Sequence, residues 1–370
     1  MQKIFTNFSL YVHIPFCSRK CLFCSFVIAV GQEHRREEYV KALINEMRMH
    51  RGKNLQTIYF GGGTPSALNE NHFDQLMREI RNNFSLNENI EITLEANPES
   101  IDASKAKFLK NLGFTRVSLG LQSMNDRFLK FLGRNHDARL GLKAYEGLRE
   151  AGFNNINLDL MYGFPGESMD ELLQDVQAIG GLGSEHLSLY SLTIEPNSRF
   201  FITQVKLDDE EKLAQQYLLI APLLATHGFE QYEISNFSKP GFQSAHNKNY
   251  WLGGAYLGVG MGAHGFDGRR RSWNISHLQE YLQRAGRPQE LVEDYEDLTD
   301  QQLLMEKILF GLRMNAGINY EAVPIEKQAL INQWIKDGFL ETFSSAGVGK
   351  VLKVTDKGRL VLDELSSRLI

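Results

Sequence analysis

The sequence predicts an α/β fold, namely a partial (β/α)6 barrel followed by a small winged-helix-like α+β domain. Between residue 9 and about residue 230, short apolar runs alternate six times with stretches of helical spacing. Successive β-then-α units form parallel strands of one sheet, because right-handed crossovers return the chain to the same sheet edge. Beyond about residue 297, two helical stretches precede two short β-like runs and a last helix. Six units, where a closed barrel has eight, predict an incomplete barrel.

The six units rest on short apolar runs that we expect to be strands. They are Ser9–Ile14, Thr57–Phe60, Ile90–Glu95, Arg116–Leu121, Asn155–Met161 and His186–Thr193. A stretch with apolar residues at helical spacing follows each run. These stretches are Glu33–Met49, residues 73–84, Ser104–Leu112, Asp137–Ala151, Met169–Ile179 and Asp208–Thr226.

Composition divides the chain into three expected parts. Residues 1–235 hold the β-then-α units and form the barrel. Residues 236–295 are rich in glycine and aromatic residues and lack a helical period, which predicts irregular, closely packed backbone. Residues 296–370 form the C-terminal domain, with 11 acidic and 9 basic residues. That negative balance argues against a DNA-binding wing.

Overall composition excludes several classes of protein. The net charge of −5 gives no general attraction to nucleic acid or anionic lipid. No apolar run approaches the ~20 residues of a membrane span. Three cysteines in 370 residues make no disulfide framework, which predicts a reducing compartment and a cytoplasmic location.

All three cysteines lie in one short stretch, HIPFCSRKCLFCSF, as Cys17, Cys21 and Cys24. Clustered thiolates bind soft metals. A structural zinc site would need a fourth ligand, for which His13 is a candidate. An iron–sulfur cluster normally takes four thiolates, so three would leave one iron open to an outside ligand. A redox-active or incidental group of thiols is a third possibility.

Residues that could bind a ligand or take part in chemistry follow the ends of successive expected strands. They are Cys17 after the first, Gly61-Gly62-Gly63-Thr64-Pro65 after the second, Glu95 closing the third, Gln122 just past the fourth and Asp159 near the end of the fifth. In α/β barrels, binding and chemistry collect at the mouth formed by the loops after the strands. We therefore expect one mouth to bring thiols, glycines and carboxylates together.

The motifs YVHIPFC, C-x3-C-x2-C, GGGTP and LEANPE resemble those of the HemN-like branch of the radical S-adenosylmethionine superfamily. Within this branch the chain is most similar to the HemW-type haem chaperones. The third cysteine is followed by Ser25-Phe26, where the related dehydrogenases have x-Cys, and the first motif begins at Tyr11, too early for their N-terminal extension. The chaperones' H-N-x-x-Y-W motif is matched by residues 246–251. The resemblance favours an iron–sulfur cluster over zinc.

The resemblance implies a [4Fe–4S] cluster on Cys17, Cys21 and Cys24, with S-adenosylmethionine on the open iron. The cofactor-binding positions that it implies are Tyr11, Phe23, Gly62, Gly63, Thr64, Glu95, Gln122, Arg134, Asp159 and Thr193. Their chemistry suits this role: glycine lets backbone approach a ligand, and the guanidinium of an arginine can bind a carboxylate in a bidentate manner.

Haem is the second ligand that the resemblance implies. His246 becomes a candidate haem ligand or attachment point, because neutral imidazole is a common iron ligand. Tyr250 and Trp251 either pack against the macrocycle or anchor their segment on the barrel. His264, in GMGAHGF, is an alternative haem partner, and His13 is expected to be structural.

The function implied by the resemblance is haem binding and delivery to haem-accepting proteins, without coproporphyrinogen III dehydrogenase activity. The alternative is an enzyme, the oxygen-independent coproporphyrinogen III dehydrogenase, which decarboxylates its substrate oxidatively. A small electron donor such as flavodoxin or ferredoxin is the expected redox partner. Nucleic acid binding and a transmembrane segment are not expected. The expected location is the cytoplasm, with peripheral contact at the membrane during haem delivery.

Overall fold

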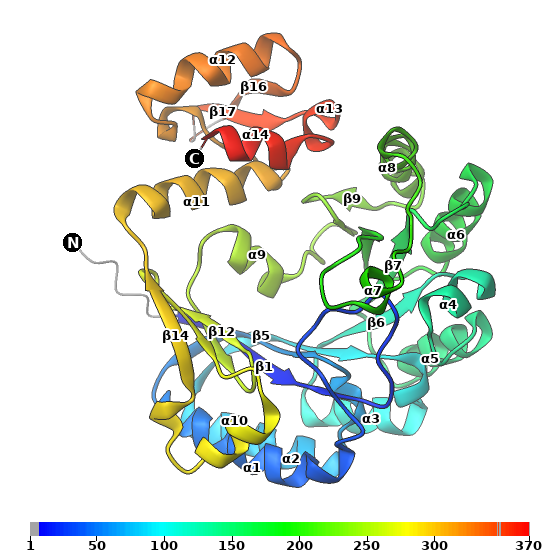
Figure 1. Ribbon diagram of the computed structural model, residues 1–370, viewed down its shortest axis with the longest axis vertical. Coiled ribbons are helices and arrows are strands. Elements are labelled where there is room, and N and C mark those ends of the chain that lie inside the picture. Colours follow the sequence, from blue (N-terminus) through cyan, green and yellow to red (C-terminus); the bar gives the residue numbers. More distant parts are fainter. Residues whose placement is uncertain (1–6, 346, 348, 370) are drawn as a thin grey trace.

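The computed structural model describes residues 7–345, 347 and 349–369 (Figure 1). Six parallel strands correspond to the six expected runs. They are β1 (Asn7–Ile14), β4 (Asn54–Gly62), β5 (Ser85–Ala96), β6 (Arg116–Gln122), β7 (Ile156–Tyr162) and β8 (His186–Ser191). The predicted α/β class and the order of its units are confirmed.

Further strands extend the sheet at both edges. They are β9 (Glu230–Gln231), β10 (Asn236–Ser238), β11 (Tyr256–Val259), β12 (His264–Phe266), β13 (Arg270–Asn274) and β14 (Val292–Asp297). Among the described residues, twelve strands form one open sheet in the order β14-β13-β12-β11-β1-β4-β5-β6-β7-β8-β10-β9. Strand β11 runs parallel to β1, as a seventh parallel strand.

The glycine-rich segment therefore forms strands where we expected irregular backbone. The strand β11 has only four residues, and one of them is Gly258, so its pattern is hidden in the sequence. The segment is a strand because all four of its residues pair with β1 and because Leu257 and Val259 are buried in the core.

Helices follow most of the parallel strands and cover the outer face of the sheet (Figure 1). They are α1 (Arg36–Met49), α2 (Glu70–Asn83), α3 (Ala103–Leu112), α5 (Ala138–Glu150), α6 (Met169–Gly181), α8 (Glu210–Ala225) and α10 (Leu278–Arg284). Two other helices, α4 (Asp126–Leu132) and α7 (Arg199–Ile202), instead contact the segment around Cys21, where the Leu22 backbone bonds to Leu132 and Phe200. Short 3-10 turns join them, namely η1 (Glu33–Arg35), η2 (Pro65–Ala67), η3 (Pro98–Ser100) and η4 (Pro288–Glu290). Side-chain caps begin several of the helices, including capping boxes at Asn69 and Ser168.

Residues alternate between the two faces of the parallel strands, apart from irregularities at Phe8/Ser9, Leu55/Thr57 and Gly120/Gln122. Outward positions such as Leu10, Ile58 and Leu119 are fully buried beneath the helices. Inward positions are polar, including Thr93, Arg116, Ser118, Asn157 and Ser188. Parallel sheets covered on both faces usually carry apolar residues throughout. The polar inner face therefore marks this side of the sheet as the place for a ligand.

The C-terminal domain follows β14 and has a hydrophobic core of its own. Its elements are α11 (Asp300–Arg313), β15 (Ile318–Asn319), η5 (Tyr320–Ala322), η6 (Ile325–Lys327), α12 (Gln328–Lys336), β16 (Leu340–Ser345), β17 (Gly349–Val354), α13 (Asp356–Arg359) and α14 (Leu362–Leu369). The three strands form an antiparallel sheet in the order β15-β17-β16. None of the helices in the described part of the chain has the length and apolar character needed to cross a membrane.

Helix α9 (Ala245–Trp251) connects the barrel with this domain. The indole of Trp251 packs edge-on against Phe310 of α11, with ring centroids 5.9 Å apart, and the Arg313 guanidinium lies 4.6 Å from its centroid. Arg359 of α13 donates hydrogen bonds to the side chains of Gln231 and Asn315. The domain thus contacts the barrel from two separate elements.

Candidate functional site

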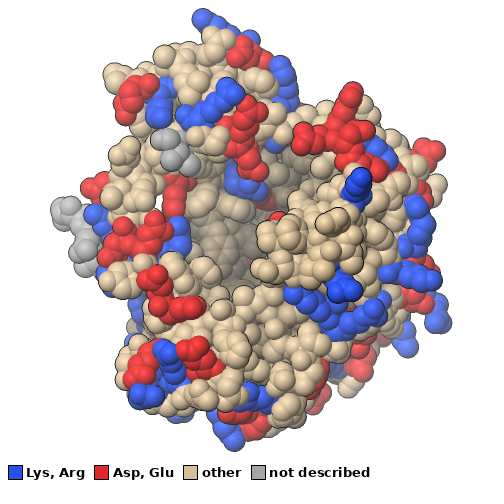
Figure 2. All heavy atoms as spheres, viewed as in Figure 1, with Lys and Arg blue, Asp and Glu red and all other residues tan. Residues whose placement is uncertain are grey.

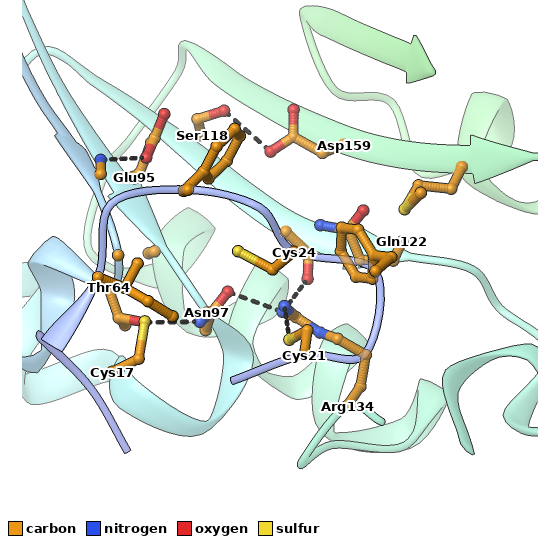
Figure 3. Close-up of a pocket in the computed structure, with 18 of the residues that line it drawn as sticks. Cys17, Cys21, Cys24, Thr64, Glu95, Asn97, Ser118, Gln122, Arg134 and Asp159 are labelled. Carbon is orange, nitrogen blue, oxygen red and sulfur yellow. Dashed lines mark hydrogen bonds between the residues drawn. The ribbon is translucent and has the colours of Figure 1, made fainter. Parts of the chain in front are cut away.

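The cysteine loop leaves β1 at the mouth of the sheet. A short parallel pair, β2 (Phe16–Cys17) and β3 (Ala29–Val30), holds the two ends of the loop together. Cys17 is buried, whereas Cys21 and Cys24 are half-buried. All three thiols line a cavity of about 460 Å³ on the inner side of the parallel strands (Figure 3). A volume of this size suits a small-molecule ligand.

A chain of polar contacts joins the first two cysteines through the neighbouring strand ends (Figure 3). Thr64 Oγ1 lies 3.4 Å from Cys17 Sγ and accepts a hydrogen bond of 3.0 Å from Asn97 Nδ2. Arg134 Nη2 donates to Asn97 Oδ1 over 2.7 Å, and its Nη1 lies 3.5 Å from Cys21 Sγ. Loops after β4, β5 and β6 therefore position the cysteine loop together.

Burial affects the pKa of two of the three thiols. Burial raises the pKa of the Cys17 thiol to about 11, and burial also raises the pKa of Cys24. A neutral thiol is a poor ligand, so metal binding must release its proton. Arg134 places a positive charge beside Cys21.

Gly62, the last residue of β4, and Gly63, directly after it, bring backbone close to the thiols. Gly62 has a φ of +119°, which other residues rarely adopt. An added Cβ at Gly63 would lie 2.6 Å from the Pro15 carbonyl oxygen and 2.9 Å from Cys17 Sγ. Only glycine fits at position 63, because neither a backbone carbonyl nor an anchored thiol can easily move aside.

Two carboxyl groups face the inner part of the cavity. Glu95 accepts hydrogen bonds from the Tyr59 hydroxyl over 2.8 Å and from the Gly62 amide over 3.1 Å. Burial raises the pKa of Glu95 to about 7. Asp159 accepts from Asn157 Nδ2 over 2.7 Å and from Ser118 Oγ over 3.2 Å, and burial raises its pKa as well.

The sequence analysis did not single out Asn97 or Arg116. Asn97 bridges Thr64 and Arg134, while Arg116 is 1% exposed and lies at the inner end of the cavity. The signal that reveals both residues is the alternation of the strands. Asn97 lies two residues after Glu95, and Arg116 lies two residues before Ser118, so both belong to the inner face as those residues do.

Most of the other expected cofactor-binding positions also line the cavity. Phe23, Gln122 and Thr193 are lining residues, and Thr193 lies just beyond the end of β8. Gln122 adopts a left-handed φ of +69°, a strained conformation for a residue other than glycine. Tyr11 does not line the cavity: its ring packs against Tyr59, with centroids 6.1 Å apart.

His13 is committed to structural contacts. Its Nε2 lies 2.8 Å from the Val27 carbonyl oxygen and its Nδ1 lies 3.2 Å from the Tyr11 hydroxyl. These contacts occupy both ring nitrogens, so His13 is not placed as a fourth zinc ligand. No group of three or more His, Cys, Asp or Glu residues in the described ranges is arranged around a single metal ion.

His246 lies in the first turn of α9 and is 1% exposed. Its Nδ1 lies 2.8 Å from Thr57 Oγ1 and its Nε2 lies 2.9 Å from the Tyr250 hydroxyl. The ring stacks on Tyr59, with centroids 4.9 Å apart. His246 is not among the residues that line the cavity, so direct iron ligation would require it to leave both partners.

The sequence of this chain is similar to those of several known proteins. A profile of the Radical SAM superfamily matches residues 11–179. A protein of Bacillus subtilis named "Heme chaperone HemW" is 36% identical over 320 residues, which cover 84% of each chain. A protein of the same name from Mycobacterium tuberculosis H37Rv is 33% identical over 98% of this chain and 95% of its own. The chain belongs to the HemW family. The Escherichia coli K12 relative, also named "Heme chaperone HemW", is 38% identical over 74% of this chain and 75% of its own.

The fold agrees with this membership. The solved structure of HemN from Escherichia coli, described as a coproporphyrinogen III oxidase and a radical SAM enzyme, has a TM-score of 0.85 and 23% identity. It covers 99% of this chain and 91% of its own, so the likeness extends through the C-terminal domain. At this identity the likeness concerns the fold.

The superfamily of the HemW family implies a [4Fe–4S] cluster and S-adenosylmethionine. The residues present fit these two cofactors. Three thiols on one loop line a single cavity, and a side chain at position 63 would collide with Cys17, so glycine is needed there. The polar lining around Glu95, Gln122 and Asp159 supplies hydrogen-bond acceptors for a charged organic cofactor.

Proposed function

We propose that the protein is a haem chaperone that binds haem and delivers it to acceptor proteins, and that it carries a [4Fe–4S] cluster and S-adenosylmethionine. The observation that carries the proposal is the opening of three thiols onto one cavity that Glu95 and Asp159 also line, in a chain whose relatives are named haem chaperones. In such a protein Cys17, Cys21 and Cys24 hold the cluster. The cluster and cofactor, when bound, supply a one-electron redox centre.

The chain's own residues prepare this site. Arg134 places positive charge beside Cys21 and binds Asn97, while Gly62 and Gly63 let backbone approach the thiols. Glu95 and Asp159 present acceptors for ammonium or hydroxyl groups of the organic cofactor. A small electron donor such as flavodoxin or ferredoxin, and a cytoplasmic location with peripheral membrane contact during delivery, belong to the same proposal.

The alternative activity is oxidative decarboxylation of coproporphyrinogen III. One anaerobic experiment on reconstituted protein separates the two functions. We expect stoichiometric haem uptake and no conversion of coproporphyrinogen III in the presence of S-adenosylmethionine and a reductant. Formation of protoporphyrinogen IX would contradict the chaperone proposal, and so would failure to bind haem.

The cluster is tested separately with the cysteines. Cys17→Ala should lower bound iron and remove the absorption near ~400 nm that iron–sulfur clusters show, because the loop loses one of its three ligands. Ser18→Ala, an exposed neighbour in the same loop, serves as the control and should retain both. Full iron content in Cys17→Ala would contradict the assignment.

A further inference from the structure

The short helix α7 lies directly against the cysteine loop. The Phe200 N–H donates to the Leu22 carbonyl oxygen over 2.9 Å, and Lys20 Nζ donates to the Asn197 carbonyl oxygen over 3.2 Å. Leu22 is the residue after Cys21, and its side chain packs in the small core that contains Phe200. One side of α7 is therefore fixed to the loop that carries the thiols.

The other side of α7 is apolar and open to solvent. Phe201 is 54% exposed and Ile202 is 64% exposed, whereas Phe200 is buried. In the orientation shared by Figures 1 and 2, the surface over α7 is largely uncharged. Single exposed apolar residues are common on protein surfaces, but two adjacent ones on a helix of four residues form a patch that a partner can cover.

Four exposed or half-buried basic residues belong to the same segments as this patch. They are Arg19 and Lys20 on the cysteine loop, Arg199 in α7 and Lys206 just beyond it. None of the four forms an ion pair within the described ranges, and the two on the loop bond only to neutral oxygens of Asn135 and Asn197. Residues 17–30 and 193–207 together hold these four basic residues and one acidic residue, Glu195, in a chain of net charge −5.

The acidic run at residues 208–211 belongs to the start of α8. Asp208 pairs with Lys212, and Asp209 caps the helix by accepting from the Lys212 backbone N–H over 2.8 Å. In Figure 2, acidic side chains gather near α8, above α7, whereas Lys and Arg side chains gather below α7. The positive charge therefore lies on the side of the cysteine loop.

We propose that this surface is the docking site of a small acidic electron-donor protein. We call it the α7 face, with Phe201 and Ile202 at its centre and Arg19, Lys20, Arg199 and Lys206 around them. The inference rests on the proposed iron–sulfur function and names the surface through which that site is reduced. In this step the donor loses one electron and the iron–sulfur site gains it, and no bond forms or breaks.

Position and charge both favour this partner. Electron transfer slows steeply with distance, and one backbone hydrogen bond joins α7 to Leu22, which lies between Cys21 and Cys24. Weak electron-transfer complexes bury little area, so a small apolar centre with a charged border is enough. Unpaired basic side chains attract an acidic partner and speed its approach. An anionic membrane would also be attracted, but membrane contact gains nothing from lying beside the thiols.

The first test measures the binding of an acidic flavodoxin to the protein with its cluster in place. Arg199→Glu reverses one charge of the α7 face, and a glutamate in the first turn of a helix suits the helix dipole. We expect the dissociation constant for flavodoxin to rise at least ~5-fold at low ionic strength. This difference should shrink at high ionic strength, because salt screens exposed charges. Lys107→Glu, the same charge reversal at an exposed position of α3, should match wild type.

The second measurement is the rate of cluster reduction, followed by absorbance. Arg199→Glu should be reduced more slowly than wild type by flavodoxin at low ionic strength, whereas dithionite should reduce both proteins equally. Ile202→Ser should weaken flavodoxin binding at low and high salt alike, because salt does not screen an apolar contact. Ile325→Ser removes an isoleucine that is 82% exposed in the C-terminal domain and should match wild type.

Three results would overturn the docking site. One is wild-type protein that does not bind flavodoxin, and another is unchanged flavodoxin binding in both Arg199→Glu and Ile202→Ser. The third is weaker binding of Arg199→Glu to vesicles containing anionic lipid with unchanged binding to flavodoxin, since the α7 face would then be a membrane contact. Wild-type protein that dithionite cannot reduce would instead overturn the proposed cluster.

Discussion

At the scale of single residues, Gly63 shows how little space the cysteine site allows. Gly63→Ala should lower bound iron by at least half after reconstitution, because the new Cβ would lie 2.6 Å from the Pro15 carbonyl oxygen and 2.9 Å from Cys17 Sγ. Iron and sulfide analysis measures the effect.

Gly181 provides the control that separates crowding beside Cys17 from a general effect of replacing glycine with alanine. Gly181 ends α6 and has no atom within 4 Å of an added Cβ, so Gly181→Ala should bind as much iron as wild type. Equal iron content in the two variants would show that the space beside Cys17 does not matter.

Glu95 predicts a pH dependence of cofactor binding. A carboxylate accepts hydrogen bonds from ammonium or hydroxyl groups, and burial raises the pKa of Glu95 to about 7. S-adenosylmethionine affinity should therefore rise as pH increases through about 7 and level off above it. Below that pH the protonated form predominates, and the dissociation constant should increase by about tenfold per pH unit. Anaerobic calorimetric titrations between about pH 5.5 and 8.5 measure this.

Glu95→Gln should bind at least ~10-fold more weakly and lose this dependence, because the amide does not titrate. Glu167→Gln is the control: burial also raises the pKa of Glu167 to about 7, but Glu167 does not line the cavity. The control should keep the pH dependence. A sloping profile in Glu95→Gln would assign the titration to another group.

At the scale of elements, the strands were predictable because their outward residues are apolar and regularly spaced. Runs such as RVSLGLQ alternate between a buried apolar face and a polar inner face. Strand β11 was missed, since a four-residue strand with glycine inside carries no such signal. Its existence depends on the pairing with β1. Local pattern therefore predicts elements that bury their own side chains, and long-range pairing decides the rest.

Helix α9 illustrates the same limit. The motif around His246 suggested haem contact, but the structure shows His246 bound to Thr57 and Tyr250, and Trp251 packed on Phe310. Haem contact by His246 remains a prediction, whereas the anchoring of Trp251 is visible. A motif identifies important residues without saying which neighbour each one meets.

Trp251→Ala tests this anchoring. Loss of the contacts with Phe310 and Arg313 should lower the free energy of unfolding by about 2 kcal/mol, since a half-buried indole is removed. Urea unfolding followed by circular dichroism measures it. Leu252→Ala changes a neighbour that is 65% exposed and should stay within about 0.5 kcal/mol of wild type. Similar losses in both variants would place the stabilisation elsewhere in α9.

At the scale of the whole molecule, polar contacts hold the C-terminal domain to the barrel at several points, including the ion pair of Arg271 with Glu306 and a group of hydrogen bonds around Arg359. Arg359 bridges the side chains of Gln231 and Asn315. The backbone N–H of Asn315 donates to the Tyr232 carbonyl oxygen over 2.9 Å. The domain has a separate core, so weakening the interface should loosen its attachment without unfolding the barrel.

Arg359→Ala should therefore speed amide hydrogen exchange in residues 231–236 and 313–317 and leave β1 to β7 unchanged. Hydrogen-exchange mass spectrometry measures both regions. Arg368, which is exposed and pairs with Glu364 within its own helix, provides the control variant Arg368→Ala. Faster exchange throughout the barrel would show that the two domains unfold as one unit.

Periodicity and strand ends are local properties of the chain, so the α/β class, the order of the parallel units and the clustering of the three cysteines could all be predicted from the sequence. Which residues face one another could not be predicted: Asn97 lies between Thr64 and Arg134, Arg116 lines the cavity, and His246 does not. The physical reason is that side-chain contacts across strands depend on register, twist and close glycine approaches. These arise only when segments far apart in the chain pack together.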